Sequence, residues 1–438
     1  MATMNRGLVS ILDRRKTISW AFYDWANSAF ATTVMAGFFP IFFKQYWAST
    51  KEVTESTFLL GSANAIASLL VVVSAPMLGA IADRGSAKRR FLIFFALMGI
   101  VMTGGLCMVE RGDWLMALVL YALAVLGFSG GNLFYDALLV DVAREDELDR
   151  VSALGFSLGY LGGGLLFALD VLMVSYPSFF GLPDAATAVR LSFLTVAIWW
   201  AVFSIPLILF VPESRPVHPP GWWDSVSGGG RQLKETFGQI RRLRMTFLFL
   251  LAYWLYIDGV DTIVRMAVDY GLSLGFDSNG LMVALLVTQF VGFPAALLFG
   301  RLGEHYGARR GITLAIFVYI LIILWAYQME QIWEFYGLAV AIGLVQGGIQ
   351  ALSRSYYARL IPRDKAGEFY GFYNMLGKFA AVAGPLLMGW VGILTGSPRL
   401  SILSVLVLFV AGALLLSFVD EEEGNRQARS LEAANIGK

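Results

Sequence analysis

The chain has 438 residues, of which 57% are hydrophobic and only 15% are charged, and its formal net charge at pH 7 is +1. A soluble protein of this length could not bury so much apolar surface, so the composition indicates a membrane protein. The near-zero net charge argues against a nucleic-acid partner. The single cysteine, Cys107, excludes an internal disulfide framework, and two distant histidines do not make an ordinary zinc site. We therefore expect no metal and no cofactor.

The N-terminal stretch 1–16 is basic but has no short apolar core followed by a cleavage site, so we interpret it as a cytoplasmic leader. Twelve apolar runs follow, each about as long as the roughly 20 residues that a membrane-spanning helix needs. Because they are continuously apolar and do not alternate, they predict helices rather than a barrel. The runs cover approximately residues 18–46, 57–82, 91–109, 114–137, 151–176, 189–211, 246–269, 279–300, 310–328, 332–356, 367–394 and 400–419.

A stretch rich in proline, glycine and charge at 213–245 divides six runs from six. The predicted fold class is an all-α polytopic membrane protein with twelve transmembrane helices in two pseudo-symmetric six-helix bundles. The predicted parts are an N-terminal bundle at 1–212, a cytoplasmic linker at 213–245, a C-terminal bundle at 246–420 and a polar tail at 421–438. We expect the tail to be partly disordered.

The distribution of lysine and arginine predicts the orientation. With the N-terminus inside, most of the 33 Lys and Arg residues fall in cytoplasmic segments. The exterior loops then hold Lys44, Lys51, Arg111, Arg190, Arg265 and Arg399. We therefore expect both termini in the cytoplasm and the protein in the plasma membrane of a bacterium.

A charged, glycine-bearing turn between the second and third runs, GAIADRGSAKRR at 79–90, has a relative at 300–310, GRLGEHYGARR. The first copy resembles the loop between helices 2 and 3 of the major facilitator superfamily. The matching residues are Gly79, Asp83, Arg84, Lys88, Arg89 and Arg90. The second copy carries Glu304 and His305 where the first has its Asp-Arg pair. The resemblance implies alternating access, with the matching Asp holding the two halves together when the transporter is open to the outside.

The helix macrodipole predicts where these acids dock. A helix N-terminus carries about half a positive charge and unpaired N–H groups. We therefore expect Asp83 to dock at the start of helix 11, with Arg84 or Arg89 completing the cluster. By the internal repeat, Glu304 should face the start of helix 5.

Three further stretches resemble the vacuole-effluxer-like branch of the superfamily, which is related to the fungal autophagy-associated amino-acid exporters. These stretches are WAFYDWANSAFATTV at 20–34, YIDGVDTIV at 256–264 and the segment 350–386. The resemblance implies twelve helices, alternating access, and export of small amino acids in the fungal members. It leaves the substrate of this chain open.

Charged residues inside the predicted spans are the main candidates for a site, because each costs roughly 2.5–3.5 kcal/mol at a helix centre. In helix 1, Asp24, Asn27 and Ser28 share one helical face, which indicates a carboxylate and an amide facing a central cavity. The alternative is that Asp24 belongs to the membrane interface and caps a neighbouring helix.

Helix 7 carries Asp258, Asp261 and Arg265 on one face, where Asp261 and Arg265 can pair. Asp258 lies further from the arginine and is therefore the better candidate for a proton carrier. The alternative is a structural ladder of ion pairs. Near the middle of helix 11, Lys378 could pair with Asp258 or bind a substrate carboxylate; the alternative is a side chain that snorkels to water.

Helices 4 and 10 carry polar stripes at four-residue spacing. Asp136 ends one stripe, and Gln346, Gln350 and Arg354 form the other. Asp136 and Arg354 are equivalent by the repeat and opposite in charge, so they could form a cytoplasmic gate. The alternative is ordinary anchoring at the interface.

No phosphate-binding G-x-x-x-x-G-K-[ST] motif occurs, which argues against an ATP-driven pump, and no catalytic constellation is evident. We therefore predict a secondary-active transporter of a small solute, possibly an amino acid, with proton coupling and efflux favoured. The alternatives are transport of a drug, sugar or lipid, and a membrane receptor that binds its solute without moving it. A membrane enzyme is disfavoured. The expected partners are the solute, membrane lipid and protons, and we expect a monomer.

Overall fold

The computed structural model describes residues 2–213, 238–239, 243–275 and 278–436. Within these ranges the chain is helical and has no strand, and twelve helices are long and apolar enough to cross a membrane. The predicted spans and the all-α fold class are thereby confirmed. Most of the predicted linker at 213–245 lies outside the described residues.

The helices of the first half begin with a long, partly π-helical element. They are α1 (Ala2–Ala29), η1 (Phe30–Phe38), α2 (Phe39–Phe42), η2 (Phe43–Trp47), α3 (Val53–Gly85), α4 (Lys88–Gly105), η3 (Leu106–Met108), α5 (Trp114–Ala137), α6 (Leu139–Val142), η4 (Glu145–Glu147), α7 (Leu148–Ser175), η5 (Pro177–Phe180) and α8 (Ala185–Phe210). The π-helical stretch η1 ends two residues before Pro40, which has no N–H to donate.

The second half repeats the pattern. Its helices are α10 (Arg244–Ser273), α11 (Ser278–Tyr306), α12 (Ala308–Gln328), α13 (Ile332–Arg359), η6 (Arg363–Lys365), α14 (Ala366–Thr395), α15 (Pro398–Ser404), α16 (Leu406–Ser417) and α17 (Glu421–Ile436). The last predicted span is divided into α15 and α16.

Large apolar side chains cover the outer faces of these helices. Val73 on α3, Phe94 on α4 and Val407 on α16 are 69%, 61% and 65% exposed, respectively. Such exposure would be costly in water, whereas lipid solvates apolar side chains. Packing between helices depends on small residues: a Cβ at Gly159 would lie 2.6 Å from Ser28 Oγ, and one at Gly163 would lie 2.9 Å from Thr32 Oγ1. These glycines therefore allow α1 and α7 to pack closely.

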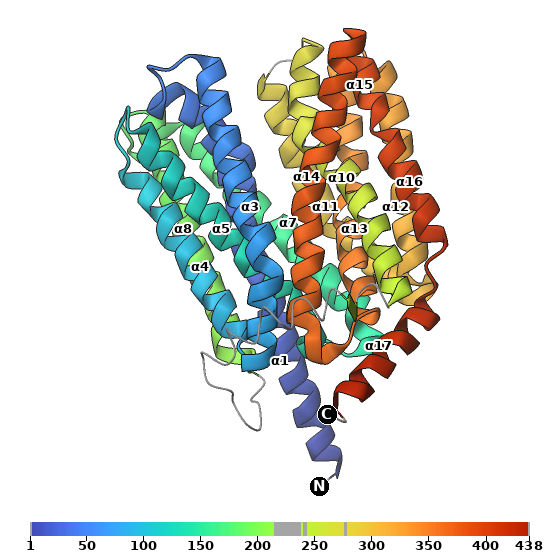
Figure 1. Cartoon of the computed structure of the whole chain (residues 1–438). Coiled ribbons are helices and arrows are strands. Elements are labelled where there is room, and N and C mark those ends of the chain that lie inside the picture. The colour runs from blue at the N-terminus through green and yellow to red at the C-terminus, as the bar shows by residue number, and fades with distance from the viewer. Residues whose placement is uncertain (1, 214–237, 240–242, 276–277, 437–438) are drawn as a thin grey trace. The chain divides into compact units, whose positions relative to one another are not determined.

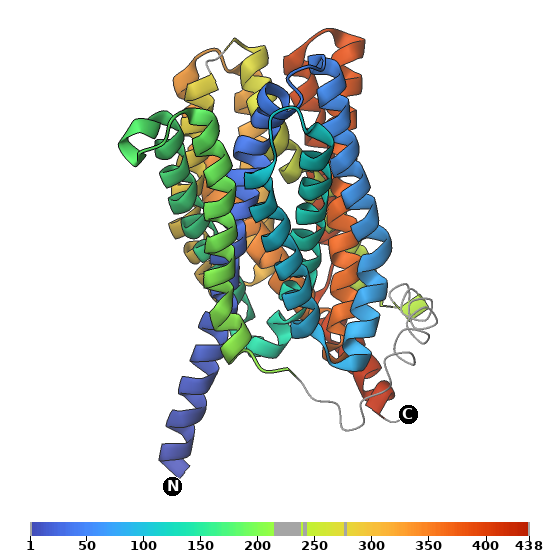
Figure 2. The same cartoon turned by 90° about the vertical axis from the view of Figure 1, so that its left-hand side faces the viewer.

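The contacts divide the chain into two compact units. Unit 1 consists of Met1–Ser74, Ser86–Leu138 and Leu158–Pro219, and unit 2 consists of Ala75–Gly85, Leu139–Ser157 and Pro220–Lys438. In unit 1, α1 packs against α8, and α4 packs against α5 (Figure 2). In unit 2, α10 packs against both α14 and α16 (Figure 1). Unit 2 therefore includes the end of α3 and the start of α7 together with the C-terminal helices.

The expectation of a partly disordered tail is wrong for the described residues, because 421–436 form the helix α17. Asp420 begins the helix by accepting the Glu423 N–H at 3.0 Å. Gly424 and Ala428 are spaced four residues apart and are both buried. The segment is rich in good helix formers and has three acids in its first turn, and the packing of its narrow face of small residues stabilises the helix further.

Candidate functional site

The predicted polar face of helix 1 forms a cluster inside unit 1. Asp24 is half-buried and accepts hydrogen bonds from Ser28 Oγ at 3.1 Å and from the Tyr135 hydroxyl at 3.3 Å. Asn27 is 1% exposed, and its Nδ2 donates to Asn132 Oδ1 at 2.5 Å. These bonds join α1 to α5 within the bundle, because the carboxylate and the amide each bind a side chain of α5.

Helix α7 approaches this cluster so closely that no side chain fits between them. A Cβ at Gly159 would lie 3.0 Å from Asp24 Oδ1. Tyr160, which follows this glycine, is 8% exposed and interacts electrostatically with Asp24. Sequence reasoning missed Tyr135, whose ring stacks on Trp20 at a centroid distance of 4.3 Å. No sequence signal points to it, because tyrosine is ordinary in a membrane helix.

In unit 2, Asp258 joins two helices. It is 1% exposed and accepts the backbone N–H of Gly384 on α14 at 2.9 Å and the Thr262 hydroxyl at 3.4 Å. A Cβ at Gly384 would lie only 1.8 Å from Thr262 Oγ1. The glycine is therefore required for α14 to approach this part of α10.

The other charges of this region lie apart from that buried joint. Arg265 is exposed, whereas Asp261 and Lys378 are half-buried. Asp261 interacts electrostatically with Arg265 and with Lys378. Within the described part of the chain, the predicted ion pair between Lys378 and Asp258 is absent. Lys378 instead interacts electrostatically with Asp261 and Arg265.

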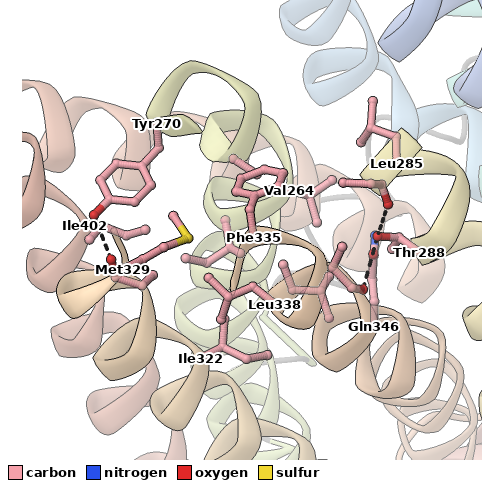
Figure 3. Close-up of a pocket in the computed structure, with 16 residues that line it drawn as sticks. Val264, Tyr270, Leu285, Thr288, Ile322, Met329, Phe335, Leu338, Gln346 and Ile402 are labelled. Carbon is pink, nitrogen blue, oxygen red and sulfur yellow. Dashed lines mark hydrogen bonds between the residues drawn. The ribbon is translucent and has the colours of Figure 1, made fainter. Parts of the chain in front are cut away.

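Gln346 lines an apolar pocket between α10, α11, α12, α13 and α15 (Figure 3). The polar groups drawn at the two ends bond to backbone carbonyls: the Tyr270 hydroxyl donates to Ala326 O at 2.8 Å, and the Thr288 hydroxyl donates to Ala284 O at 3.0 Å. The Gln346 amide is thus the polar group of the pocket best placed to meet a ligand. Gln350, one turn further along α13, is half-buried.

Arg354 is held by the start of α7. It is 2% exposed, and its guanidinium donates from Nε to Ser152 Oγ at 2.9 Å and from Nη2 to Ser152 O at 2.9 Å. It also lies over the Phe156 ring, 4.4 Å from the centroid. Asp136, its predicted partner, is at the end of α5 in unit 1. The pairing of Asp136 with Arg354 stays a prediction.

The first copy of the repeated motif places its acid as predicted. Asp83 accepts the backbone N–H of Gly367 at 3.0 Å and of Glu368 at 2.8 Å, in the first turn of α14. A Cβ at Gly79 would lie 2.1 Å from the carbonyl oxygen of Gly367, so this glycine allows α3 to reach α14. The predicted docking of Asp83 at the start of helix 11 is confirmed.

The predicted role of the arginines in that cluster is wrong. Arg84 is exposed, and Arg89 binds the end of α8, donating to Val211 O at 2.7 Å and to Ile208 O at 3.3 Å. The reversal at Ser86, with φ of 45°, starts α4 in a new direction. Arg89 therefore reaches the carbonyl end of a helix, which attracts a cation.

The second copy is similar in architecture but differs in chemistry. Glu304 Oε1 lies 3.7 Å from Arg150 Nε, so it faces the start of helix 5 as predicted. A Cβ at Gly300 would lie 2.5 Å from Ala153 Cβ, so the glycine allows α11 and α7 to approach closely. Arg309 donates to Val419 O at 2.9 Å, just beyond α16, as Arg89 does beyond α8.

Sequence reasoning missed Asp149, which forms a buried ion pair. It is 1% exposed and accepts hydrogen bonds from Nη1 and Nη2 of Arg359, each at 2.9 Å, and from the Ser355 hydroxyl. Bidentate charge-assisted bonds of this kind are strong and directional. Asp149 and Arg359 lie at the ends of predicted spans, where charges are ordinary, so no signal singles them out.

Comparison with known proteins identifies the family of this chain. The model of a family described as vacuole effluxer Atg22 like matches residues 46–429. That range includes the stretches 256–264 and 350–386 but begins after 20–34. The chain is 40% identical over 406 residues to the "Uncharacterized MFS-type transporter YxiO" of Bacillus subtilis (strain 168), covering 92% of this chain and 94% of that protein.

Fungal autophagy-related proteins match at lower identity. Autophagy-related protein 22 of Yarrowia lipolytica is 28% identical over 321 residues, which cover 66% of this chain and 53% of that protein. Two solved structures share the fold. The human organic anion transporter MFSD10 has a TM-score of 0.70 at 17% identity, covering 92% of this chain and 99% of that one. The proton:xylose symporter XylE has a TM-score of 0.69 at 12% identity, covering 96% and 98%.

Proposed function

Because the chain belongs to the Atg22-like vacuole effluxers, a family of major facilitator transporters and not of enzymes, we propose that it works by alternating access as a secondary-active transporter. The observation that carries this proposal is the pair of joints made by the repeated motif. Asp83 holds α3 to α14, and Glu304 holds α11 to α7 through Arg150. Each joint consists of a few polar contacts, which can break and re-form during a cycle.

The proposed location is a bacterial plasma membrane, with both termini in the cytoplasm. The excess of Lys and Arg in alternate loops supports this orientation. In this orientation the two joints close the cytoplasmic side, and they must open when the solute enters from or leaves to the cytoplasm. Asp136 and Arg354 form the proposed gate on the same side.

The proposed substrate is a small amino acid, with efflux as the direction. Amino-acid export is an implication of the resemblance to the fungal relatives. The candidate residues carry the chemistry that a zwitterion requires: Asp24 and Asp261 are acids, Asn27 is an amide, and Arg265 and Lys378 are cations. An acid can bind an ammonium group, and a guanidinium or a lysine can bind a carboxylate.

The proposed driving force is a proton gradient, with Asp258 as the carrier. The observation that supports it is a carboxyl group that is 1% exposed and bound to a backbone N–H and a hydroxyl. One of these donors lies on α14, and uptake of a proton by the carboxylate weakens the bond to it, so gain and loss of a proton can be coupled to movement of α10 against α14.

Transport by purified protein in liposomes tests this proposal. A thermal-shift screen against amino acids, peptides and sugars first selects ligands, and uptake of the labelled ligands is then measured with and without an imposed pH gradient. Protein-free liposomes provide the control. Saturable, gradient-dependent amino-acid flux is expected. A ligand that stabilises the protein without any flux would favour the receptor alternative, and flux of sugars or lipophilic drugs alone would refute the substrate assignment.

A further inference from the structure

The C-terminal helix α17 lies across the ends of other helices of unit 2 instead of extending into solvent. Its buried face is formed by Gly424 and Ala428, with Ala428 only 3% exposed. A Cβ at Gly424 would lie 2.3 Å from Leu360 Cδ2 and 3.2 Å from Met245 Cβ. Figure 1 shows α17 in dark red, directly after α16. This packing attaches the first half of α17 to α10 and to the end of α13.

The charged edge of α17 binds the short segment before α7. Arg429 Nη2 lies 2.9 Å from both carboxylate oxygens of Glu145, and Asn425 Nδ2 donates to Glu145 Oε1 at 2.8 Å. Glu145 is in η4, just before α7 begins. Three bonds from two successive turns of α17 therefore converge on one carboxylate.

A second contact connects α17 to the buried ion pair of the same region. Glu421 Oε1 lies 3.5 Å from Arg359 Nε, and the same guanidinium holds Asp149 through its other two nitrogens. Burial raises the pKa of Glu421, and the charge of Arg359 opposes that rise. Arg359 thus binds one acid from α7 and one from α17 at the same time.

We propose that α17 is a conformational clasp, which holds the start of α7 to the end of α13 and so favours the state in which these ends are joined. This proposal rests on the proposed alternating access, because the joint matters only if it opens during transport. The exposed charges act together with a buried apolar face, so the clasp can release without unfolding either unit. Arg429, Asn425 and Glu421 are its positioning residues, and none of them needs to contact the transported solute.

A buried thiol reports whether the joint is closed. Ser152 is fully buried, and its hydroxyl donates to Ala351 O on α13 at 2.7 Å. In a Cys107→Ser background, Ser152→Cys introduces one thiol that a maleimide reaches only when α7 and α13 separate. Its labelling rate is measured on the purified full chain in nanodiscs, and flux is measured in parallel.

Charge reversal tests the clasp directly. Arg429→Glu and Glu145→Arg should each raise the labelling rate about 2- to 5-fold, the range expected for losing exposed, mutually supporting ion pairs. In the double variant the labelling rate should return most of the way to that of the unchanged chain, because the two substitutions restore the ion pair with its charges exchanged. Arg426→Glu is the matched control: it changes the net charge equally, but Arg426 is exposed, and its ion pair among the described residues is with Glu423 of its own helix.

The outcomes separate the clasp from the transport proposal. Faster labelling in both single variants, recovery in the double variant and no change in Arg426→Glu would support the clasp. If Asp83→Ala increases labelling while Arg429→Glu and Glu145→Arg do not, the clasp is refuted and alternating access remains. If labelling is the same in all variants although flux persists, the clasp is again refuted. Equal increases in Arg429→Glu and Arg426→Glu would assign the effect to net charge and also refute it.

Discussion

Removing the carboxylate of Asp83 should shift the transporter towards the state in which α3 and α14 are apart. Asp83→Ala deletes two charge-assisted bonds, to the N–H groups of Gly367 and Glu368 at 3.0 and 2.8 Å. A hydrogen bond to a charged group contributes about 1.5–3 kcal/mol, and because Asp83 is only half-buried, water replaces part of both bonds, which leaves a loss of about 2 kcal/mol for the pair. A loss of about 2 kcal/mol changes a two-state equilibrium by about 30-fold.

The assay is the labelling rate of a thiol placed beneath this joint. Ala75 is 1% exposed and lies against α14, where a Cβ at Gly371 would be 2.8 Å from Ala75 O. With Ala75→Cys in a Cys107→Ser background, Asp83→Ala should accelerate labelling and slow turnover, with substrate affinity in the opened state little changed. Asp83→Asn keeps an acceptor oxygen and should have a smaller effect, and Arg84→Ala, at an exposed side chain, should have none. Unaltered labelling together with lost substrate binding would refute the latch.

Asp258→Asn retains an oxygen that can accept the backbone N–H from α14, so melting temperature and insertion should be preserved while the pH dependence of liposome flux falls; unchanged pH dependence would exclude Asp258 as the proton carrier. Asp136→Arg and Arg354→Asp should each reduce flux, and combining them should recover part of it; a double variant no better than the worse single one would refute the gate. Gly79→Ala places a Cβ about 2.1 Å from a backbone oxygen of α14 and should lower the melting temperature and flux, since overpacking costs about 1–3 kcal/mol. Gly61→Ala on the same helix, where the Cβ meets nothing within 4 Å, should do neither, and equal effects of the two changes would refute the close-approach argument.

The parts of the fold that could be predicted depend on strong, local physical constraints. A membrane helix must be long and apolar, so twelve spans can be read from hydropathy and are present among the described residues. The docking of Asp83 could also be predicted, because a short acid after one helix and an N-terminus on the same side of the membrane attract each other.

Other contacts depend on how the backbone brings distant residues together, which a local stretch of sequence does not reveal. The partner of Arg89 is decided by the backbone reversal at Ser86, which aims α4 at the end of α8. The bidentate pair of Asp149 and Arg359 joins residues 210 positions apart, and each alone looks like an interfacial charge. The helix α17 forms on a polar segment whose residues favour a helix, but its docking depends on the packing of Gly424 against Leu360 and Met245, residues far away in the sequence.

The two copies of the motif make similar contacts through their arginines but different contacts through their acids. Arg89 and Arg309 each bind the carbonyl groups at the end of the last helix of their half, at Val211 and Val419. The acids diverge, because Asp83 accepts two backbone N–H groups at a helix start, whereas Glu304 only faces Arg150 at 3.7 Å.

This difference decides which joint governs the equilibrium. The side chains of Arg150 and Glu304 are 58% and 23% exposed, and exposed ion pairs contribute about 0–1 kcal/mol, less than the docked carboxylate of Asp83. The joint between α11 and α7 therefore needs another contact to be as strong as the joint between α3 and α14. Asp149 supplies it through Arg359, beside the weaker pair. The buried ion pair of Asp149 with Arg359 and the contacts of α17 thus lie on the side of Glu304, where the acid of the motif makes the weaker contact.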